Sequence, residues 1–314
     1  MCLAFRPPLS LAVRSLSSRT VLCDTRKLLH STWPSRKLSD GSAASPPVAA
    51  QLDTAAAPME NRLLCSRFLS SHGISAQDQL AVVLLNWTLP QLTPRLWHTA
   101  TLRVCADGGA NRLYDELPGM LPGESAEAVR AQYLPTAIQG DLDSIRPDVV
   151  DFYRRHGVPV HDLSGDQDST DLQKCIAYVR QHAQEQNLEL RHLTLAALGA
   201  LGGRLDHSLS SLSTLHTHRD LNLVLLGDGN LARLVPAGRC TIRPDRSLEG
   251  PSCGLVPCGG PAVASSSGLR WNLHDTEMRI GALVSTSNLI AADEVVVESD
   301  ADLVWTTQLK VQHS

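Results

Sequence analysis

The chain has 314 residues, of which 43% are hydrophobic and 19% are charged, and its formal net charge is -4 at pH 7. This composition predicts a globular protein of one large or two modest domains, and it excludes global disorder. The charge is too acidic for a protein that binds nucleic acid by neutralising phosphates, and no apolar run approaches the ~20 residues that span a bilayer. We therefore expect neither a nucleic-acid partner nor a membrane partner.

The first 58 residues differ in composition from the rest. They carry seven Lys or Arg and three acidic residues, and they are rich in Ser, Ala and Pro. An Arg- and Ser-rich, acid-poor segment is typical of a mitochondrial transit peptide. The other interpretation is a disordered or alternatively initiated extension, with Met59 as an internal start. We favour the second interpretation because Pro7 and Pro8 interrupt any early helix.

The eight cysteines include no Cys-x-x-Cys pair, and several of them lie inside apolar patterns. Buried reduced thiols are therefore expected instead of disulfides, and these indicate a reducing compartment. We expect a cytoplasmic protein, or a mitochondrial one if residues 1–58 act as a transit peptide.

Apolar runs and helical patterns alternate along residues 59–227. Strands buried on both faces are expected at residues 81–85, 102–106, 137–138, 193–198 and 223–226. Helices are expected over residues 110–117, 147–153, 170–179 and 205–215. This alternation predicts an α/β fold, with βαβ units and a mainly parallel sheet.

The pattern changes over residues 228–314. Short extended segments, separated by Gly, Pro, Ser and Asn, follow one another without a convincing helix. They cover residues 231–235, 240–242, 254–256, 268–273, 280–286, 294–298 and 303–309. This part of the chain is predicted to be an all-β sandwich domain.

Three short aspartate clusters follow predicted strands. They are Asp107, the pair Asp141 and Asp143, and the group Asp166, Asp168 and Asp171. Because ligands bind beyond the carboxyl ends of parallel strands, we expect all three clusters at one edge of the sheet. Crowded carboxylates need a neutralising cation, and hard oxygen ligands suit Mg2+. The clusters therefore predict an enzyme that handles phosphate groups through magnesium.

The aspartate clusters also have structural interpretations. Asp141 and Asp143 are compatible with a solvated Asx turn, and either Asp168 or Thr170 is compatible with a helix cap. An EF-hand is rejected, because Asp171 and Ala177 stand where that loop needs Gly and Glu. Asp166 is itself compatible with a simple turn residue.

Two glycine-containing loops add candidates for phosphate binding. The run from Asp107 to Asn111 places two glycines between a strand and a helix, which favours an anion at the helix N-terminus. It matches neither the dinucleotide fingerprint nor the Walker A pattern, so an ordinary glycine-rich turn is the alternative. Arg204 and Asp206 follow a later strand, and they suit either a phosphate and ribose or a simple surface ion pair.

Trp271 is the aromatic candidate in the C-terminal part. It follows a run of serines and a glycine, and its ring could stack on a flat or cationic substrate. A buried core position is the commoner outcome for a tryptophan, and it is our expectation from this residue alone.

Taken together and in chain order, these motifs resemble the thiamine pyrophosphokinase family of the animal type. The resemblance covers nearly everything from Met59 onward. It rests on residues 107–115, 140–147, 166–171, 202–206, 268–273 and 283–288. It implies transfer of the terminal diphosphate of ATP to the hydroxyethyl group of thiamine, giving thiamine diphosphate and AMP. It also implies a nucleotide-binding α/β domain that binds ATP and Mg2+, a thiamine-binding β-sandwich, and a homodimer with its sites between subunits.

The resemblance also implies roles for individual residues. Asp141, Asp143 and Asp171 would hold Mg2+, and Asp168 or Asp171 would accept the hydroxyl proton. The nucleotide and phosphate side would contain Asp107, Gly108, Asn111, Arg204 and Asp206. The thiamine side would contain Gln167, Thr170, Trp271, Ser285, Ser287 and Asn288, with Trp271 and Ser285 supplied by the partner subunit.

The chain departs from the family pattern at Leu205, at His207, at Ser213 and in the segment 289–292. These departures concern fine ligand contacts and a loop near the thiamine side, whereas the metal aspartates are intact. Two other functions stay open from the residues themselves. They are a magnesium-dependent phosphohydrolase that uses the same aspartates and a non-enzymatic module that binds a cation.

Overall fold

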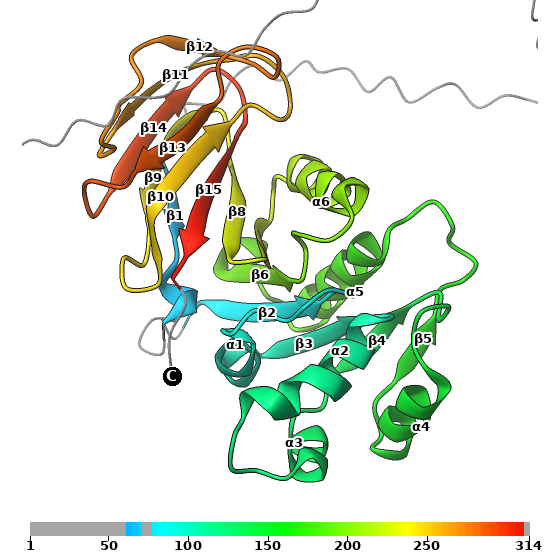
Figure 1. Ribbon diagram of the computed structural model, residues 1–314. Coiled ribbons are helices and arrows are strands. Elements are labelled where there is room, and N and C mark those ends of the chain that lie inside the picture. Colours follow the sequence, from blue (N-terminus) through cyan, green and yellow to red (C-terminus); the bar gives the residue numbers. More distant parts are fainter. Residues whose placement is uncertain (1–60, 71–76, 311–314) are drawn as a thin grey trace, which may run out of the picture. The chain divides into compact units, whose positions relative to one another are not determined.

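The computed structural model describes residues 61–70 and 77–310 (Figure 1). The interpretations of residues 1–58 concern a segment that lies outside the described residues. Within the described ranges, no helix is both long enough and apolar enough to cross a membrane.

Six parallel strands form the α/β part of the sheet, in the order β7-β6-β2-β3-β4-β5. Their bounds are β2 (Gln79–Leu84), β3 (Leu102–Ala106), β4 (Ala137–Gly140), β5 (Val160–Asp162), β6 (Leu193–Leu198) and β7 (Asn222–Gly227). The central strands β2, β3 and β6 consist mainly of Leu, Ala and Val because both of their faces are covered. All six were predicted from apolar stretches, with β5 as the short strand expected before the third aspartate cluster.

Helices cover both faces of this parallel region. Their bounds are α1 (Thr93–Thr99), α2 (Gly109–Glu116), α3 (Ala126–Gln132), α4 (Pro147–Arg155), α5 (Asp171–Glu185) and α6 (Leu205–Thr217). Short 3-10 turns are η1 (Arg67–Leu69), η2 (Leu117–Met120) and η3 (Leu190–His192). Leu96, Leu113 and Val149 of α1, α2 and α4 belong to one core, whereas Ile176 of α5 and Leu215 of α6 belong to the other. The strands between them alternate, so successive residues point into different cores.

The strand order changes direction at β2. From β2 the chain adds β3, β4 and β5 on one side, and then returns to add β6 and β7 on the other side. Such a reversal opens a crevice beyond the carboxyl ends of the two strands that flank it, here β2 and β6. The sequence predicted the strands, but not this order.

The C-terminal part is rich in strands, as predicted, and it extends the same sheet. Strands β8 (Asn230–Val235), β15 (Leu303–Leu309), β10 (Glu249–Val256) and β13 (Ser285–Leu289) continue from β7 in antiparallel pairs, giving a mixed sheet of ten strands. The boundary expected between residues 227 and 228 falls in the turn from β7 to β8, and sheet pairing continues across it.

A second sheet has the order β1-β9-β14-β11-β12. Its strands are β1 (Arg62–Cys65), β9 (Gly238–Arg243), β14 (Val295–Ser299), β11 (Ala262–Ser267) and β12 (Thr276–Met278). Ile242 and Val297 of this sheet share one core with Leu255 and Trp305 of the ten-stranded sheet, which is the packing of a sandwich. Because β1 precedes the α/β part in the chain, the second sheet is assembled from both ends of the described body.

Two predicted strands are wrong. Residues 268–273 form turns, and most of residues 280–286 lie outside strands, with β13 starting only at Ser285. Gly268 and Gly281 have positive φ angles of 85° and 86°, which turn the chain away from extended pairing. Helices α1 and α3 and strands β1, β11 and β12 were not predicted, because short or serine-rich segments carry little periodic signal.

Candidate active site

Asp107 directly follows β3 and has an unusual backbone conformation. Its φ angle is 34°, and its side chain is completely buried. The carboxylate accepts two backbone hydrogen bonds, from the Ser144 N–H at 3.0 Å and from the Ile145 N–H at 3.0 Å. Asp107 therefore holds the loop that follows β4 against the end of β3.

Two glycines allow this close approach. A Cβ atom on Gly140 would lie 2.6 Å from the Cβ of Asp107, so only glycine lets the ends of β3 and β4 come together here. A Cβ on Gly108, which was predicted to contact nucleotide, would lie 2.3 Å from the Asn86 side chain. The loops after β2, β3 and β4 are thus closely packed against one another at these two glycines.

Asp107, Asp141 and Asp143 form an acidic cluster. One carboxylate oxygen from each residue lies within 4.8 Å of the other two. Asp107 is buried, Asp141 is half-buried and Asp143 is exposed, so the cluster opens toward solvent on one side. Burial raises the pKa of Asp107 to about 6, although its two backbone hydrogen bonds act in the opposite direction. Three carboxylate oxygen donors this close together fit a hard divalent cation such as Mg2+.

Asp171 approaches the acidic cluster from α5. It is the first residue of that helix, and its pKa is raised, mainly by burial and then by the charge of Asp141. The ammonium group of Lys174 lies between these two carboxylates, 3.9 Å from Asp171 Oδ1 and 4.0 Å from Asp141 Oδ2. Lys174 was missed in the sequence, where it has the spacing of an ordinary helical residue.

The segment before α5 is built from local turns. Thr170 caps the helix through a capping box with Gln173, so the cap predicted at Asp168 or Thr170 is Thr170. The Asp166 carboxylate accepts the N–H groups of Asp168 and Ser169, which is a turn role. The Gln167 amide donates to the Ser164 carbonyl at 2.8 Å. The exposed Asp168 carboxylate makes no hydrogen bond or ion pair within the described part of the chain.

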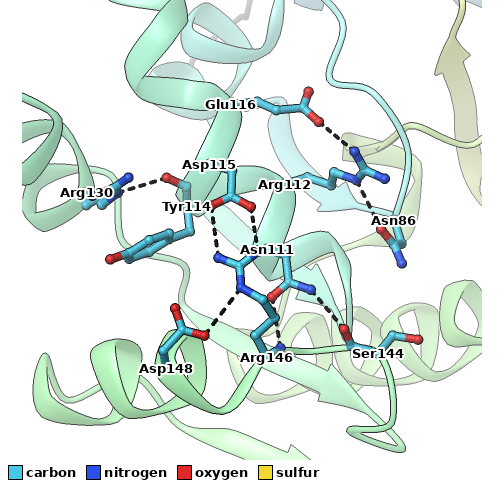
Figure 2. A network of polar contacts seen from close by, with 10 residues as sticks. All are labelled: Asn86, Asn111, Arg112, Tyr114, Asp115, Glu116, Arg130, Ser144, Arg146 and Asp148. Atoms are coloured by element: carbon cyan, nitrogen blue, oxygen red, sulfur yellow. Dashed lines mark hydrogen bonds and ion pairs between the residues drawn. The ribbon is translucent and has the colours of Figure 1, made fainter.

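Asn111 and Arg146 fasten the loop after β4 to helix α2, as Figure 2 shows. The Asn111 amide donates to the Ser144 carbonyl at 2.9 Å and accepts the Arg146 N–H at 3.0 Å. The Arg146 guanidinium group in turn makes a two-pronged pair with Asp115, at 2.6 and 2.9 Å. The Asn111 side chain, predicted to face nucleotide, is therefore engaged with the backbone of the loop that carries the cluster.

Arg204 and Asp206 lie at the start of α6 and pair with each other at 2.5 Å. Their side chains are 70% and 64% exposed, so this pair is free to rearrange around a ligand. The preceding turn is shaped by Trp87, which follows β2. A Cβ on Gly203 would lie 2.7 Å from the Trp87 ring, and a Cβ on Gly202 would lie 2.0 Å from Asp228. These contacts lie at the crevice between β2 and β6.

The second group of predicted residues lies in and beside β13. Trp271 is 54% exposed, so the expectation of a core tryptophan is wrong; the tryptophans in the cores are Trp97 and Trp305. The Arg270 guanidinium group lies over the Trp271 ring, 4.8 Å from its centroid. Buried Asn288 accepts the Trp271 N–H at 3.2 Å and donates to the Trp271 carbonyl at 2.7 Å. Asn288 thus positions the exposed ring through its backbone.

The two groups of residues are far apart in the sheet. Strand β13, with Ser285, Ser287 and Asn288, is one edge of the ten-stranded sheet, whereas β4 is next to the other edge. Neighbouring strands lie roughly 4.8 Å apart, so the eight spacings between β13 and β4 span on the order of 40 Å along the sheet. No hydrogen bond, ion pair or ring contact among the described residues joins Trp271 to the acidic cluster.

An open cavity of about 690 Å³ lies at the end of the antiparallel strands. Its lining includes Asp228 from the β7–β8 turn, Ser252 from β10, Ser287 from β13 and Thr306 from β15. Of the predicted site residues, only Ser287 contributes to this lining.

Comparison with known proteins gives consistent matches. The family model described as "Thiamin pyrophosphokinase, catalytic domain" matches residues 93–225, and that described as "Thiamin pyrophosphokinase, vitamin B1 binding domain" matches residues 239–304. Thiamine pyrophosphokinase 1 of Arabidopsis thaliana is 51% identical over 238 residues, which cover 75% of this chain and 88% of that protein.

Solved structures agree in fold. The crystal structure of yeast thiamin pyrophosphokinase has a TM-score of 0.68 at 25% identity and covers 79% of this chain and 91% of its own. Thiamin pyrophosphokinase from Candida albicans has a TM-score of 0.67 at 23% identity and covers 81% of this chain and 95% of its own.

Proposed function

Since this chain belongs to the thiamin pyrophosphokinase family, we propose that it transfers the terminal diphosphate of ATP to the hydroxyl group of thiamine. The products are thiamine diphosphate and AMP. The structural observation that supports this proposal is the acidic cluster of Asp107, Asp141 and Asp143, which lies at the carboxyl ends of β3 and β4. A phosphohydrolase and a non-enzymatic cation module share the cluster, but neither accounts for matches to both halves of the chain.

Magnesium is the cation that we propose for the cluster. Asp141 and Asp143 would hold it, with Asp171 completing the set from α5 and Asp107 fixing the loop from behind. Bound there, Mg2+ would neutralise charge between the phosphate groups of ATP. Carboxylate oxygens alone make up this donor set, which is the chemistry that hard cations prefer.

We place the nucleotide across the crevice between β2 and β6. Gly108 and the start of α2 lie on one side of this crevice, and Arg204 and Asp206 lie on the other. Arg204 is exposed and paired only with Asp206, so its guanidinium group can turn to a phosphate. The polyphosphate would then extend toward the acidic cluster.

The reaction forms one bond and breaks one. The thiamine hydroxyl oxygen attacks the β-phosphorus of ATP, the bond from that phosphorus to the oxygen bridging to the α-phosphorus breaks, and AMP leaves with that oxygen. The hydroxyl proton passes to Asp168 or to Asp171. The free carboxylate of Asp168 favours Asp168, whereas the proximity of Asp171 to Lys174 favours a binding role for Asp171. Gln167 and Thr170 lie beside these residues and would face thiamine.

We propose a homodimer in which two subunits complete each site. Within one subunit, Trp271 and Ser285 belong to the sheet edge opposite the acidic cluster, so they serve the cluster of a second copy. Helix α6 supports this proposal, because Leu205 and Leu209 are 72% and 56% exposed and form an uncovered apolar surface. The leucines of this helix are therefore only partly used by its own core, through buried Leu215 and half-buried Leu212.

We also propose a cytoplasmic location. All six cysteines in the described part of the chain are free thiols, and five of them are at least half-buried, which suits a reducing compartment.

The proposal is tested by supplying the protein with thiamine, ATP and Mg2+ and separating the nucleotide products. We expect AMP to form in step with thiamine diphosphate, and no nucleotide cleavage without thiamine. ADP as the product would contradict the proposed transfer, and phosphate release without an acceptor would favour the phosphohydrolase.

A further inference from the structure

The side chain of Lys174 is a largely buried cation beside the acidic cluster. This side chain is 3% exposed, and it projects from the first turn of α5 between Asp141 and Asp171. Its Nζ atom is 3.9 and 4.0 Å from their nearest carboxylate oxygens, which is beyond the reach of a hydrogen bond. Within the described part of the chain, this nitrogen makes no hydrogen bond at all.

The three N–H donors of this ammonium group are open to a ligand. The Nζ atom of Lys174 is not one of the completely buried, unpaired side-chain atoms of the described residues, so water reaches it until a ligand takes its place. Two loose ion pairs offset part of the charge, but they satisfy none of the donors. An additional acceptor, anionic and reaching the gap between the two carboxylates, would satisfy them.

The neighbouring charges indicate which chemical group this acceptor is. Four carboxylates, those of Asp107, Asp141, Asp143 and Asp171, surround the gap, and they repel a polyphosphate. Lys174 is the cation fixed among them, because Arg204 belongs to the start of α6 and is 70% exposed. A phosphate oxygen that approaches beside a bound cation therefore meets the Lys174 ammonium group.

We propose that Lys174 is a catalytic residue that contacts an oxygen of the β- or γ-phosphate of ATP during the transfer. The inference rests on the proposed function. The ammonium group keeps its three protons throughout, and it stabilises the charge that builds on the phosphoryl oxygens as the hydroxyl oxygen bonds to phosphorus. AMP does not make this contact, because it lacks both of these phosphates.

The competing interpretation is that Lys174 is only a counter-ion that keeps the four carboxylates together. Lys174→Met separates the two, since it keeps an unbranched side chain that is only one atom shorter and removes its charge. The matched control is Lys310→Met, because Lys310 is the only other lysine in the described part of the chain and is exposed at the end of β15.

The experiment compares kcat with the affinities for AMP and for a non-hydrolysable ATP analogue, both measured by calorimetry with Mg2+ present. For Lys174→Met we expect kcat to fall by about 100-fold or more, as for loss of one fixed group that stabilises developing charge. The affinity for the analogue should fall by about tenfold or more while that for AMP is unchanged. Lys310→Met should match the wild type in all three.

Equal losses of AMP and analogue affinity, or a kcat within about threefold of the wild type, would overturn the inference. If Lys174→Met does not fold, Lys174→Gln gives the same comparison with a neutral donor at this position. Absence of AMP formation by the wild-type protein would instead refute the proposed function, so the two failures are distinguishable.

Discussion

The Trp87 indole donates a hydrogen bond from Nε1 to Asp228 Oδ1 at 2.8 Å. This bond joins the residues that follow β2 and β7, two strands that are separated in the sheet by β6. The turn after β6 is thereby enclosed, with Gly202 against Asp228 and Gly203 against the Trp87 ring. This turn leads directly to Arg204, the candidate phosphate contact. The hydrogen bond therefore fixes the position of the backbone from which the Arg204 side chain extends.

Trp87→Phe keeps a ring under Gly203 but removes the donor. We expect the KM for ATP to rise by about tenfold or more, which corresponds to loss of one hydrogen bond to a charged group, while the KM for thiamine stays unchanged. Asp228→Ala, which removes the acceptor, should have an effect in the same direction. Asp220→Ala is the control, since Asp220 also accepts side-chain hydrogen bonds at a turn but pairs with Arg180 away from the crevice. Equal kinetic effects at Asp220 and Asp228 would refute this role.

Asp141→Asn tests the metal assignment. Removing one carboxylate from the cluster should lower kcat by about 100-fold or more and raise the Mg2+ concentration needed for half-maximal rate. Asp166→Asn is matched in chemistry, because an asparagine oxygen can still accept the two turn hydrogen bonds of Asp166. Activity that survives Asp141→Asn at the level of Asp166→Asn would show that Asp141 is an ordinary turn residue.

Asn111→Ala tests whether the loop after β4 must be held by α2. The change removes both hydrogen bonds from the backbone at Ser144 and Arg146, so the cluster loses its alignment while all carboxylates remain. We expect the stabilisation by Mg2+, read as the rise in Tm on adding the ion, to shrink, and unfolding to become easier by about 1–3 kcal/mol. Gln181→Ala serves as the control on the outer face of α5, where the amide contacts only Glu185. An unchanged Mg2+ effect on Tm would mean that the loop holds its shape without Asn111.

Mixing two inactive variants tests the shared site. An Asp141→Asn subunit supplies an intact Trp271, and a Trp271→Ala subunit supplies an intact acidic cluster. Random mixing should restore about a quarter of the wild-type rate, since about half of the dimers are mixed and each of these has one complete site. Activity no higher than the sum of the separate variants would place Trp271 and Asp141 in unrelated sites.

The strands and their aspartates were predictable because the signals are local. An apolar run followed by Asp107 or by Gly140 and Asp141 identifies the end of a buried strand, and parallel strands bring such ends to one edge. The contacts that Lys174 and Asn111 make in the site were not predictable. Their partners follow other strands, and only the tertiary fold brings them together.

The apolar residues show a different limit. The predicted helical pattern of α6 comprises Leu205, Leu209, Leu212 and Leu215. Leu215 is buried in its own core and Leu212 packs against that core, yet Leu205 and Leu209 are exposed. Trp271 was likewise expected inside from residue type alone and is exposed. Periodicity detects an apolar surface, but it does not distinguish a surface that packs within the chain from one that awaits a ligand or a second copy.

The most direct test of the central claim follows the phosphate groups themselves. The protein is incubated with thiamine, Mg2+ and ATP labelled at its γ-phosphorus, and the products are separated. The proposed diphosphate transfer predicts that the label appears in thiamine diphosphate, with one unlabelled AMP formed for each. Label in thiamine monophosphate together with ADP, or label released as free phosphate, would contradict it.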